Sequence, residues 1–184
     1  TRRKSIQAFP NKFPYEIPNA WKLIKLGNLV KKMTNGIYKP AQFYSDEGIL
    51  CLRMYNIRDG RINFESPKRI IVSDKELHTY ELLPGDMLVN RVNSKELVGK
   101  AAVIPEMAEP LIFESKNIRI RLVDSSALPQ YCNLLFQTRL YRNIIEGYSK
   151  QACGQATVSQ PQLSARPVPL PPLPQQHRIV SQVD

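Results

Sequence analysis

Residues 157–180, TVSQPQLSARPVPLPPLPQQHRIV, change chemical character three times within one short stretch. A polar segment rich in Ser and Gln leads into a ladder of prolines, and a second polar segment then leads into apolar residues at helical spacing. Proline is tolerated in the first turn of a helix, where its missing N–H would have no intrahelical partner. We therefore predict a helix that starts near Pro174 and carries Ile179, Val180 and Val183 on one face.

The proline ladder also permits a different interpretation. Arg166, Pro169 and Pro172 have the spacing of a polyproline II ligand for an SH3 domain. Such a ligand usually lies in a disordered tail, whereas this ladder follows a globular-type sequence and precedes a helix start. A non-catalytic interaction protein that uses the ladder nevertheless stays open as an alternative.

Five further motifs occur along the chain in a fixed order. They are IPNAWK with KLG at 17–22 and 25–27, NGIYKP at 35–40, GILCLRMYNI at 48–57, LPGDMLVNRVNS at 83–94, and GKAAVI at 99–104. Together with the tail, these motifs resemble the target-recognition domain in the specificity subunit of type I restriction–modification enzymes. The resemblance runs from about Ile17 to the end of the chain, with two departures at Arg166-Pro167 and Gln175, where the family has an apolar residue and an acid.

The resemblance implies the function and the partners. A specificity subunit carries two such domains, each reading one half of a split double-stranded DNA target, and conserved spacer helices between them bind the modification (methylase) subunits. The restriction subunit would be an indirect partner. S-adenosylmethionine, ATP and Mg²⁺ would belong to the partner subunits, and this chain would hold no cofactor and no metal. The system methylates host DNA and defends the bacterial or archaeal cytoplasm against foreign DNA.

The same resemblance divides the chain into three parts. Residues 1–16 are expected to form an N-terminal arm or linker, residues 17–172 the recognition domain, and residues 173–184 the start of a truncated spacer helix. One recognition domain would need a second one, or a second copy of itself, to read a whole target. A recognition domain cut from a fused restriction–methylation enzyme is the other alternative.

Length, composition and cysteine content limit the classes of protein to which the chain can belong. A chain of 184 residues with 42% hydrophobic residues supports one folded domain. It lacks an apolar run long enough for a membrane span and a visible signal peptide. Cys51, Cys132 and Cys153 lack metal-site spacing, and apolar neighbours predict that Cys51 and Cys132 are buried free thiols.

The net charge of +10 is uneven along the chain. Residues 1–61 hold twelve Lys and Arg against four acids, residues 62–124 hold nine against ten, and residues 125–184 hold five against two. A basic surface of this size suits a polyanion, because contacts to phosphates release condensed counterions. A basic surface kept for solubility is the alternative, and no basic amphipathic helix indicates membrane binding.

Local patterns predict a mixed α/β (α+β) fold, a twisted β-rich domain with flanking helices. Strands are expected at 21–26, 49–57, 87–92, 101–104 and 117–123. In the last, Arg119 and Arg121 alternate with apolar residues and are expected on a solvated face. Turns are expected at Asp59-Gly60 and Pro84-Gly85, a capped helix from Ser73, and one long helix over 128–146 that Gly147 ends.

Loop-like clusters and strand ends are expected to hold the side chains that read DNA. Arg and Lys suit guanine, Asn and Gln suit adenine, and lysines contact phosphates with little special geometry. The predicted DNA-binding residues are Tyr38, Lys39, Arg53, Tyr55, Asn56, Arg91, Asn93, Ser94, Lys95, Lys100, Lys116 and Asn117. Their structural alternatives are ion pairs of Arg53 and Arg91 with Asp86 or Glu47, packing for Tyr38 and Tyr55, and turns at Asn35-Gly36 and Asn93-Ser94.

Two enzyme classes are the alternatives to this interpretation. Asp86, Glu114 and Lys116 match a loose nuclease signature in which carboxylates hold Mg²⁺ beside a lysine. A methyltransferase would need a glycine-rich cofactor loop and an Asn/Asp-Pro-Pro-aromatic motif, and the sequence has neither. We therefore predict a non-catalytic, sequence-specific DNA-recognition protein.

Overall fold

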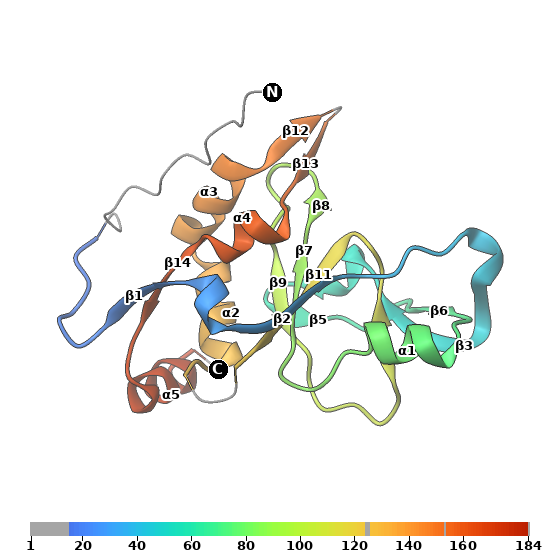
Figure 1. The fold of residues 1–184 in the computed structure, drawn as a ribbon, viewed down its shortest axis with the longest axis horizontal. Helices are drawn as coiled ribbons and strands as arrows, with labels where there is room; N and C mark the ends of the chain where they lie inside the picture. The colour runs from blue at the N-terminus through green and yellow to red at the C-terminus, as the bar shows by residue number, and fades with distance from the viewer. Residues whose placement is uncertain (1–14, 124–125, 153, 184) are drawn as a thin grey trace.

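The computed structural model describes residues 15–123, 126–152 and 154–183, and its fold is mixed α/β as predicted. A four-stranded sheet in the order β2-β11-β7-β9 occupies the middle of the molecule (Figure 1). Its strands are β2 (Val30–Asn35), β11 (Asn117–Leu122), β7 (Met87–Asn90) and β9 (Ala101–Val103), and all neighbours are antiparallel.

Helices cover one face of this central sheet. They are α2 (Pro129–Gln137), α3 (Arg139–Tyr148), α4 (Gln160–Ser164) and α5 (Leu173–Ser181), which lie to the left of the sheet in Figure 1. Met87, Val89, Ile118 and Ile120 from the sheet enter the same apolar core as Phe136 of α2. No helix within the described ranges is long and apolar enough to cross a membrane.

A second layer covers the other face of the sheet. The strands β3 (Tyr44–Leu52), β6 (Lys68–Ile70) and β10 (Leu111–Phe113) form a three-stranded sheet in the order β10-β3-β6, and helix α1 (Asp74–Tyr80) packs on β10. Leu88 and Ala102 of the central sheet share a core with Leu52 and Phe113 of this layer. The middle strands of the central sheet, β7 and β11, are therefore covered on both faces.

The smaller elements connect these layers. They are β1 (Lys22–Lys25), β4 (Ile57–Arg58), β5 (Arg61–Ile62), β8 (Val92–Asn93), β12 (Lys150–Ala152), β13 (Gln155–Thr157), β14 (Pro167–Leu170), and the 3₁₀ helices η1 (Leu26–Leu29), η2 (Ala41–Phe43) and η3 (Met54–Asn56). Three sequence predictions of local structure are confirmed. Asp59 and Gly60 both have positive φ in the β4–β5 hairpin, Gly85 has φ +84° in its turn, and Ser73 caps α1 with Glu76 in a reciprocal capping box.

The proline ladder forms a strand and is not a free ligand. Strand β14 pairs antiparallel with β1 in a two-stranded sheet, and Val168 pairs with Ile24. Proline is confined to edge positions in sheets because it has no N–H to donate. Residues 166–171 are buried, so an SH3 domain has no access to them, and that alternative is wrong.

Two other predictions are corrected. The helix expected over 128–146 is two helices, because Thr138 between them has an extended backbone (φ −69°, ψ 142°) and its Oγ1 accepts a hydrogen bond from Tyr141 N. Gly147 does not end α3, which continues to Tyr148. The strand expected over 49–57 ends at Leu52, and η3 follows it.

Arg119 of β11 does not lie on a solvated face, and Arg121 of the same strand is half-buried. Arg119 is 1% exposed and donates to the carbonyl oxygens of Thr79 and Glu81 at the C-terminal end of α1. A cation is favoured at that end of a helix, where free carbonyls concentrate negative potential. The alternation along β11 therefore distinguishes two faces that are both covered by protein. The strand pattern alone does not show this, because the second layer that covers the arginine face comes from other segments of the chain.

Candidate nucleic-acid interface

Three loop segments converge on one turn, Glu114 to Asn117, which is closed by a hydrogen bond of 3.0 Å from Asn117 N to Glu114 O. Arg91 donates to this turn through its backbone N (2.8 Å to Lys116 O) and its Nη1 (3.3 Å to Ser115 O). Ser115 N donates to Ile37 O (2.8 Å), and Met54 N donates to Glu114 Oε1 (3.2 Å). Backbone and side-chain hydrogen bonds therefore bring the segments around Tyr38, Arg53, Arg91 and Lys116 together.

The end of β2 approaches this turn so closely that only glycine fits. A Cβ at Gly36 would lie 2.2 Å from Glu114 O, far inside a normal contact distance. Gly36 N also donates to Asn117 O (3.1 Å). The Asn35-Gly36 pair is thus a site of close backbone packing, which holds Tyr38 beside the turn.

Six of the predicted DNA-binding residues lie on this turn or on the segments that are joined to it, and we call them the loop-tip surface. They are Tyr38, Arg53, Tyr55, Arg91, Ser94 and Lys116. Tyr38 is 80% exposed and Tyr55 is 67% exposed, so packing does not account for either ring. Arg53 stacks its guanidinium over the Tyr55 ring, 5.5 Å from the centroid.

The positive charge of the loop-tip surface is not neutralised by salt bridges. Arg53, Arg91 and Lys116 form no salt bridge with the residues that the structure describes. The expected partner Asp86 is held by Arg121 instead, with Nε to Oδ1 at 2.7 Å. Arginines that have no salt-bridge partner and lie beside exposed aromatic rings suit the binding of phosphates and base edges.

Three predicted residues are buried at the roots of these loops. Asn56, Asn93 and Asn117 are 3%, 8% and 0% exposed, and their side-chain amides are engaged inside the protein. Base readout by these three is contradicted, because a base edge has no access to a buried and hydrogen-bonded amide.

Lys39 and Lys95 are engaged in salt bridges. Lys39 lies 2.7 Å from Glu76 and over the Phe43 ring, and its ion pair holds the pKa of Glu76 down, to about 2. Lys95 lies 2.8 Å from Glu146 of α3. Both are weaker phosphate candidates than the sequence predicted, because each already has a carboxylate partner.

Lys100 lies in a separate groove of about 570 Å³ that Tyr55 also lines. Burial and then the nearby Arg58 lower the pKa of Lys100. Arg142 of α3 reaches the same groove, as do Asp59, Glu65 and Glu96. Arg142 was missed because no sequence signal places α3 beside the β4–β5 hairpin.

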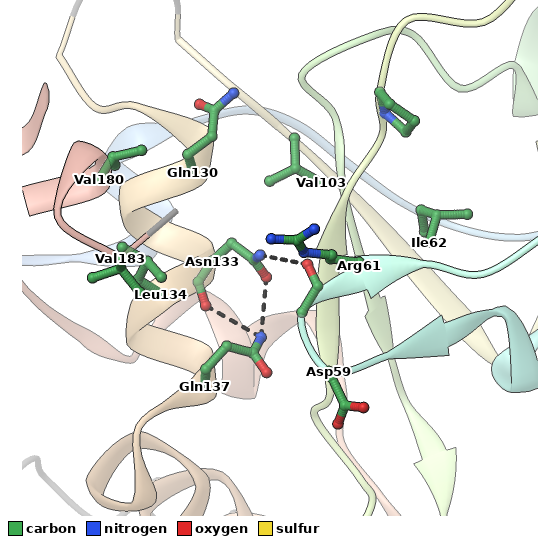
Figure 2. Close-up of a pocket in the computed structure, with 12 residues that line it drawn as sticks. Asp59, Arg61, Ile62, Val103, Gln130, Asn133, Leu134, Gln137, Val180 and Val183 are labelled. Atoms are coloured by element: carbon green, nitrogen blue, oxygen red, sulfur yellow. Dashed lines mark hydrogen bonds between the residues drawn. The ribbon is translucent and has the colours of Figure 1, made fainter.

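A second cavity, of about 500 Å³, lies between the β4–β5 turn, α2 and α5. Figure 2 shows Leu134, Val180 and Val183 on one side of it. Asn133 and Gln137 extend from α2 toward this turn, and Asn133 donates to Gly60 O at 2.8 Å. None of the loop-tip residues lines this cavity.

The nuclease signature is not assembled as a metal site. Asp86 is engaged by Arg121, and Glu114 accepts a hydrogen bond from the backbone of Met54. Within the described part of the chain, no three His, Cys, Asp or Glu residues are grouped so that they could hold a metal ion.

A mixed α/β domain that presents a basic and aromatic loop surface has the form of a nucleic-acid recognition module. The chain belongs to the family described as "Type I restriction modification DNA specificity domain", which matches residues 18–184. A specificity domain is a recognition component, in agreement with the prediction that this chain is not itself an enzyme.

Individual relatives agree with this family. The chain is 28% identical over 166 residues to a putative type I restriction enzyme specificity subunit, MjaX, of Methanocaldococcus jannaschii, and 29% identical over 169 residues to the EcoKI specificity subunit of Escherichia coli K12. The matches cover 89% and 90% of this chain but only 39% and 36% of the relatives.

A solved structure shows the same fold. The crystal structure of the HsdS subunit from Thermoanaerobacter tengcongensis superposes with a TM-score of 0.66 at 19% identity. The superposition covers 93% of this chain and 38% of that one.

Proposed function

We propose that this chain reads one half of a bipartite double-stranded DNA target, as a recognition domain in a type I restriction–modification specificity subunit. The observation that carries the proposal is the loop-tip surface, in which Arg53, Arg91 and Lys116 stand unneutralised beside two exposed tyrosines. Family membership supports it, because the family is defined by DNA specificity.

Different side chains of this surface contact bases and phosphates. Arg53 and Arg91 contact base edges, where an arginine fits the two acceptors of guanine. Lys116 contacts phosphates at the rim of the surface, and Lys100 contacts them from the adjoining groove. The modification subunits contact α5, and S-adenosylmethionine, ATP and Mg²⁺ act in the partner subunits.

The test is selection from a random duplex pool by the full-length subunit assembled with a matching modification subunit. We expect enrichment of a defined half-site of about three to five base pairs. Arg53→Ala and Arg91→Ala should each relax the preference at one position, at a cost of about 1–3 kcal/mol. Arg139→Ala is the matched control, because Arg139 is exposed on α3, outside both the loop-tip surface and α5.

The outcomes separate the parts of the proposal. Binding without enrichment would reduce the domain to a basic DNA-associating module. Enrichment that survives both arginine substitutions would keep the domain as a DNA reader but move the base contacts away from Arg53 and Arg91.

A further inference from the structure

Three buried asparagines form a chain of hydrogen bonds beneath the loop-tip surface. Ser94 N donates to Asn93 Oδ1 (2.9 Å), and Asn93 Nδ2 donates to Asn90 Oδ1 (2.7 Å). Asn90 Nδ2 donates to Asn117 Oδ1 (3.2 Å), and Asn117 Nδ2 donates to Leu52 O (3.4 Å). We call Asn93, Asn90 and Asn117 the amide relay.

The relay runs head to tail between segments far apart in the sequence. It begins at Ser94 of the loop-tip surface and ends at Leu52, the residue before Arg53. Asn90 Nδ2 also donates to Lys116 O (3.0 Å), which adds the central turn. The central turn and two of the three loop segments are thus connected by one set of directed bonds.

Because these amides are buried, each hydrogen bond of the relay needs its partner in a defined position. Asn90 and Asn117 are 0% exposed, and Asn93 is 8% exposed. A buried amide without its partner is costly, and chained hydrogen bonds strengthen one another where water is excluded. Apolar contacts would tolerate small shifts of one loop against another. The directed hydrogen bonds of the relay are satisfied only when the loops keep one mutual arrangement.

A further buried asparagine, Asn56, holds the segment that carries Arg53. Asn56 is 3% exposed, and its Oδ1 accepts from Arg53 N (2.9 Å) while its Nδ2 donates to Asn63 O (2.8 Å). The backbone on which Arg53 stands is therefore held from both sides, by Asn56 after it and by the relay at Leu52 before it.

We propose that the amide relay is a positioning network for base readout: it sets Arg91 and Ser94 on one segment and Arg53 on another at the mutual spacing that a particular base sequence requires. This inference rests on the proposed function. Base contacts depend on sub-ångström placement of the readers, whereas phosphate contacts by flexible lysines do not. Disturbing the relay should therefore lower sequence discrimination while nonspecific, salt-dependent binding persists.

The chain offers a matched control in Asn133. Asn133 is 9% exposed, donates to Gly60 O (2.8 Å) and accepts from Gln137 Nε2 (3.1 Å). It thus has nearly the same burial and the same kind of bonds as Asn93, but it lies beside the cavity of Figure 2. A purely structural role for Asn93 predicts that the two alanine substitutions behave alike.

The experiment uses the full-length subunit with its modification subunits and the duplex that the wild-type protein selects. Asn93→Ala and Asn133→Ala are compared by thermal unfolding, by the ratio of affinities for the selected and a scrambled duplex, and by the salt slope on the scrambled duplex. Asn93→Asp is the second variant, because it keeps the volume and the acceptor for Ser94 N but cannot donate to Asn90.

We expect both alanine variants to lower the unfolding midpoint similarly. The affinity ratio should fall about tenfold in Asn93→Ala and in Asn93→Asp, and stay near the wild-type value in Asn133→Ala. The salt slope should stay unchanged in both alanine variants, because neither substitution changes a charge.

Two results would overturn the positioning role and leave the proposed function standing. They are an unchanged affinity ratio in the Asn93 variants, or an equal fall of that ratio in Asn133→Ala. If the wild-type protein enriches no sequence at all, the proposed function fails first, and the positioning role fails with it. The wild-type selection therefore distinguishes the two failures.

Discussion

Arg121 on β11 holds Asp86 at the start of β7 with two hydrogen bonds, each of 2.7 Å, from Nε to Oδ1 and from Nη2 to Oδ2. Asp86 is 2% exposed, and its Oδ2 also accepts from Leu83 N (2.8 Å). This ion pair joins the two middle strands of the central sheet to the Pro84-Gly85 turn.

Asp86→Ala should lower the free energy of unfolding by about 3 kcal/mol, because it leaves the guanidinium of Arg121 without its buried counter-charge. Urea denaturation measures the change, with Asp46→Ala as the control because Asp46 is an exposed acid. A loss below about 1 kcal/mol would place this pair among ordinary surface salt bridges.

The Lys39–Glu76 pair predicts an acid-dependent loss of stability. The ion pair with Lys39, at 2.7 Å, and then the hydrogen bond from Ser73 N lower the pKa of Glu76 from 4.5 to about 2. Glu76 should therefore contribute stability fully above pH 4.5, and the contribution should be lost as the pH falls toward 2.

Denaturant midpoints of the wild type and Glu76→Gln, measured from roughly pH 2 to 6, test this expectation. The difference between the two proteins should shrink as the pH falls through this window. A difference that is constant with pH would show that the carboxylate charge of Glu76 has no part in it.

Lys100 and Lys95 should differ in their effect on DNA binding. Lys100 forms no salt bridge within the described residues, whereas Lys95 is paired with Glu146 at 2.8 Å. If Lys100 neutralises one phosphate, Lys100→Gln should make the slope of log K against log salt shallower by about 0.9, and Lys95→Gln should change it less. Equal effects of the two substitutions would mean that the Glu146 ion pair opens when DNA binds.

Gln176 should control how firmly α5 is attached to the domain. It is 0% exposed, and it donates to Pro171 O (2.9 Å) and Ser126 O (3.2 Å) while accepting from Leu128 N (2.8 Å). Gln176→Ala should cost about 2–3 kcal/mol, because it leaves these backbone groups without their partner.

Hydrogen exchange at the Leu128 amide reports this attachment directly, and it should speed up in Gln176→Ala. The neighbouring His177→Ala is the control, since His177 is exposed on the same helix. Unchanged protection of Leu128 in Gln176→Ala would show that packing of Ile179 and Val180 alone holds α5.

Local signals in the sequence predicted local structure well. The Asp59-Gly60 hairpin and the Ser73 capping box depend on residues within four positions of each other, and both are confirmed. The buried thiols of Cys51 and Cys132 were also predicted correctly from their apolar neighbours, and burial raises the pKa of each to about 12. Cys153 lies outside the described residues.

The candidate site was predicted only in part. Tyr38, Arg53, Arg91 and Lys116 meet at one turn, but their neighbours in sequence, Asn93 and Asn117, turn inward to hold the loops. Asn90, which was not predicted, lies at the centre of the relay; an amide at the end of the apolar stretch MLVN was its only signal.

The sequence by itself determined the family, the mixed α/β class, the basic character and the local turns and caps, because each is written in contiguous residues or in ordered motifs. The tertiary structure decided what each polar side chain does. Arg119 became a buried cap of α1, the proline ladder became a strand against β1, and Asn117 became a link between loops. The physical reason is that burial and hydrogen-bond partners come from segments up to about 150 residues apart, such as β1 and β14, which no local pattern brings together.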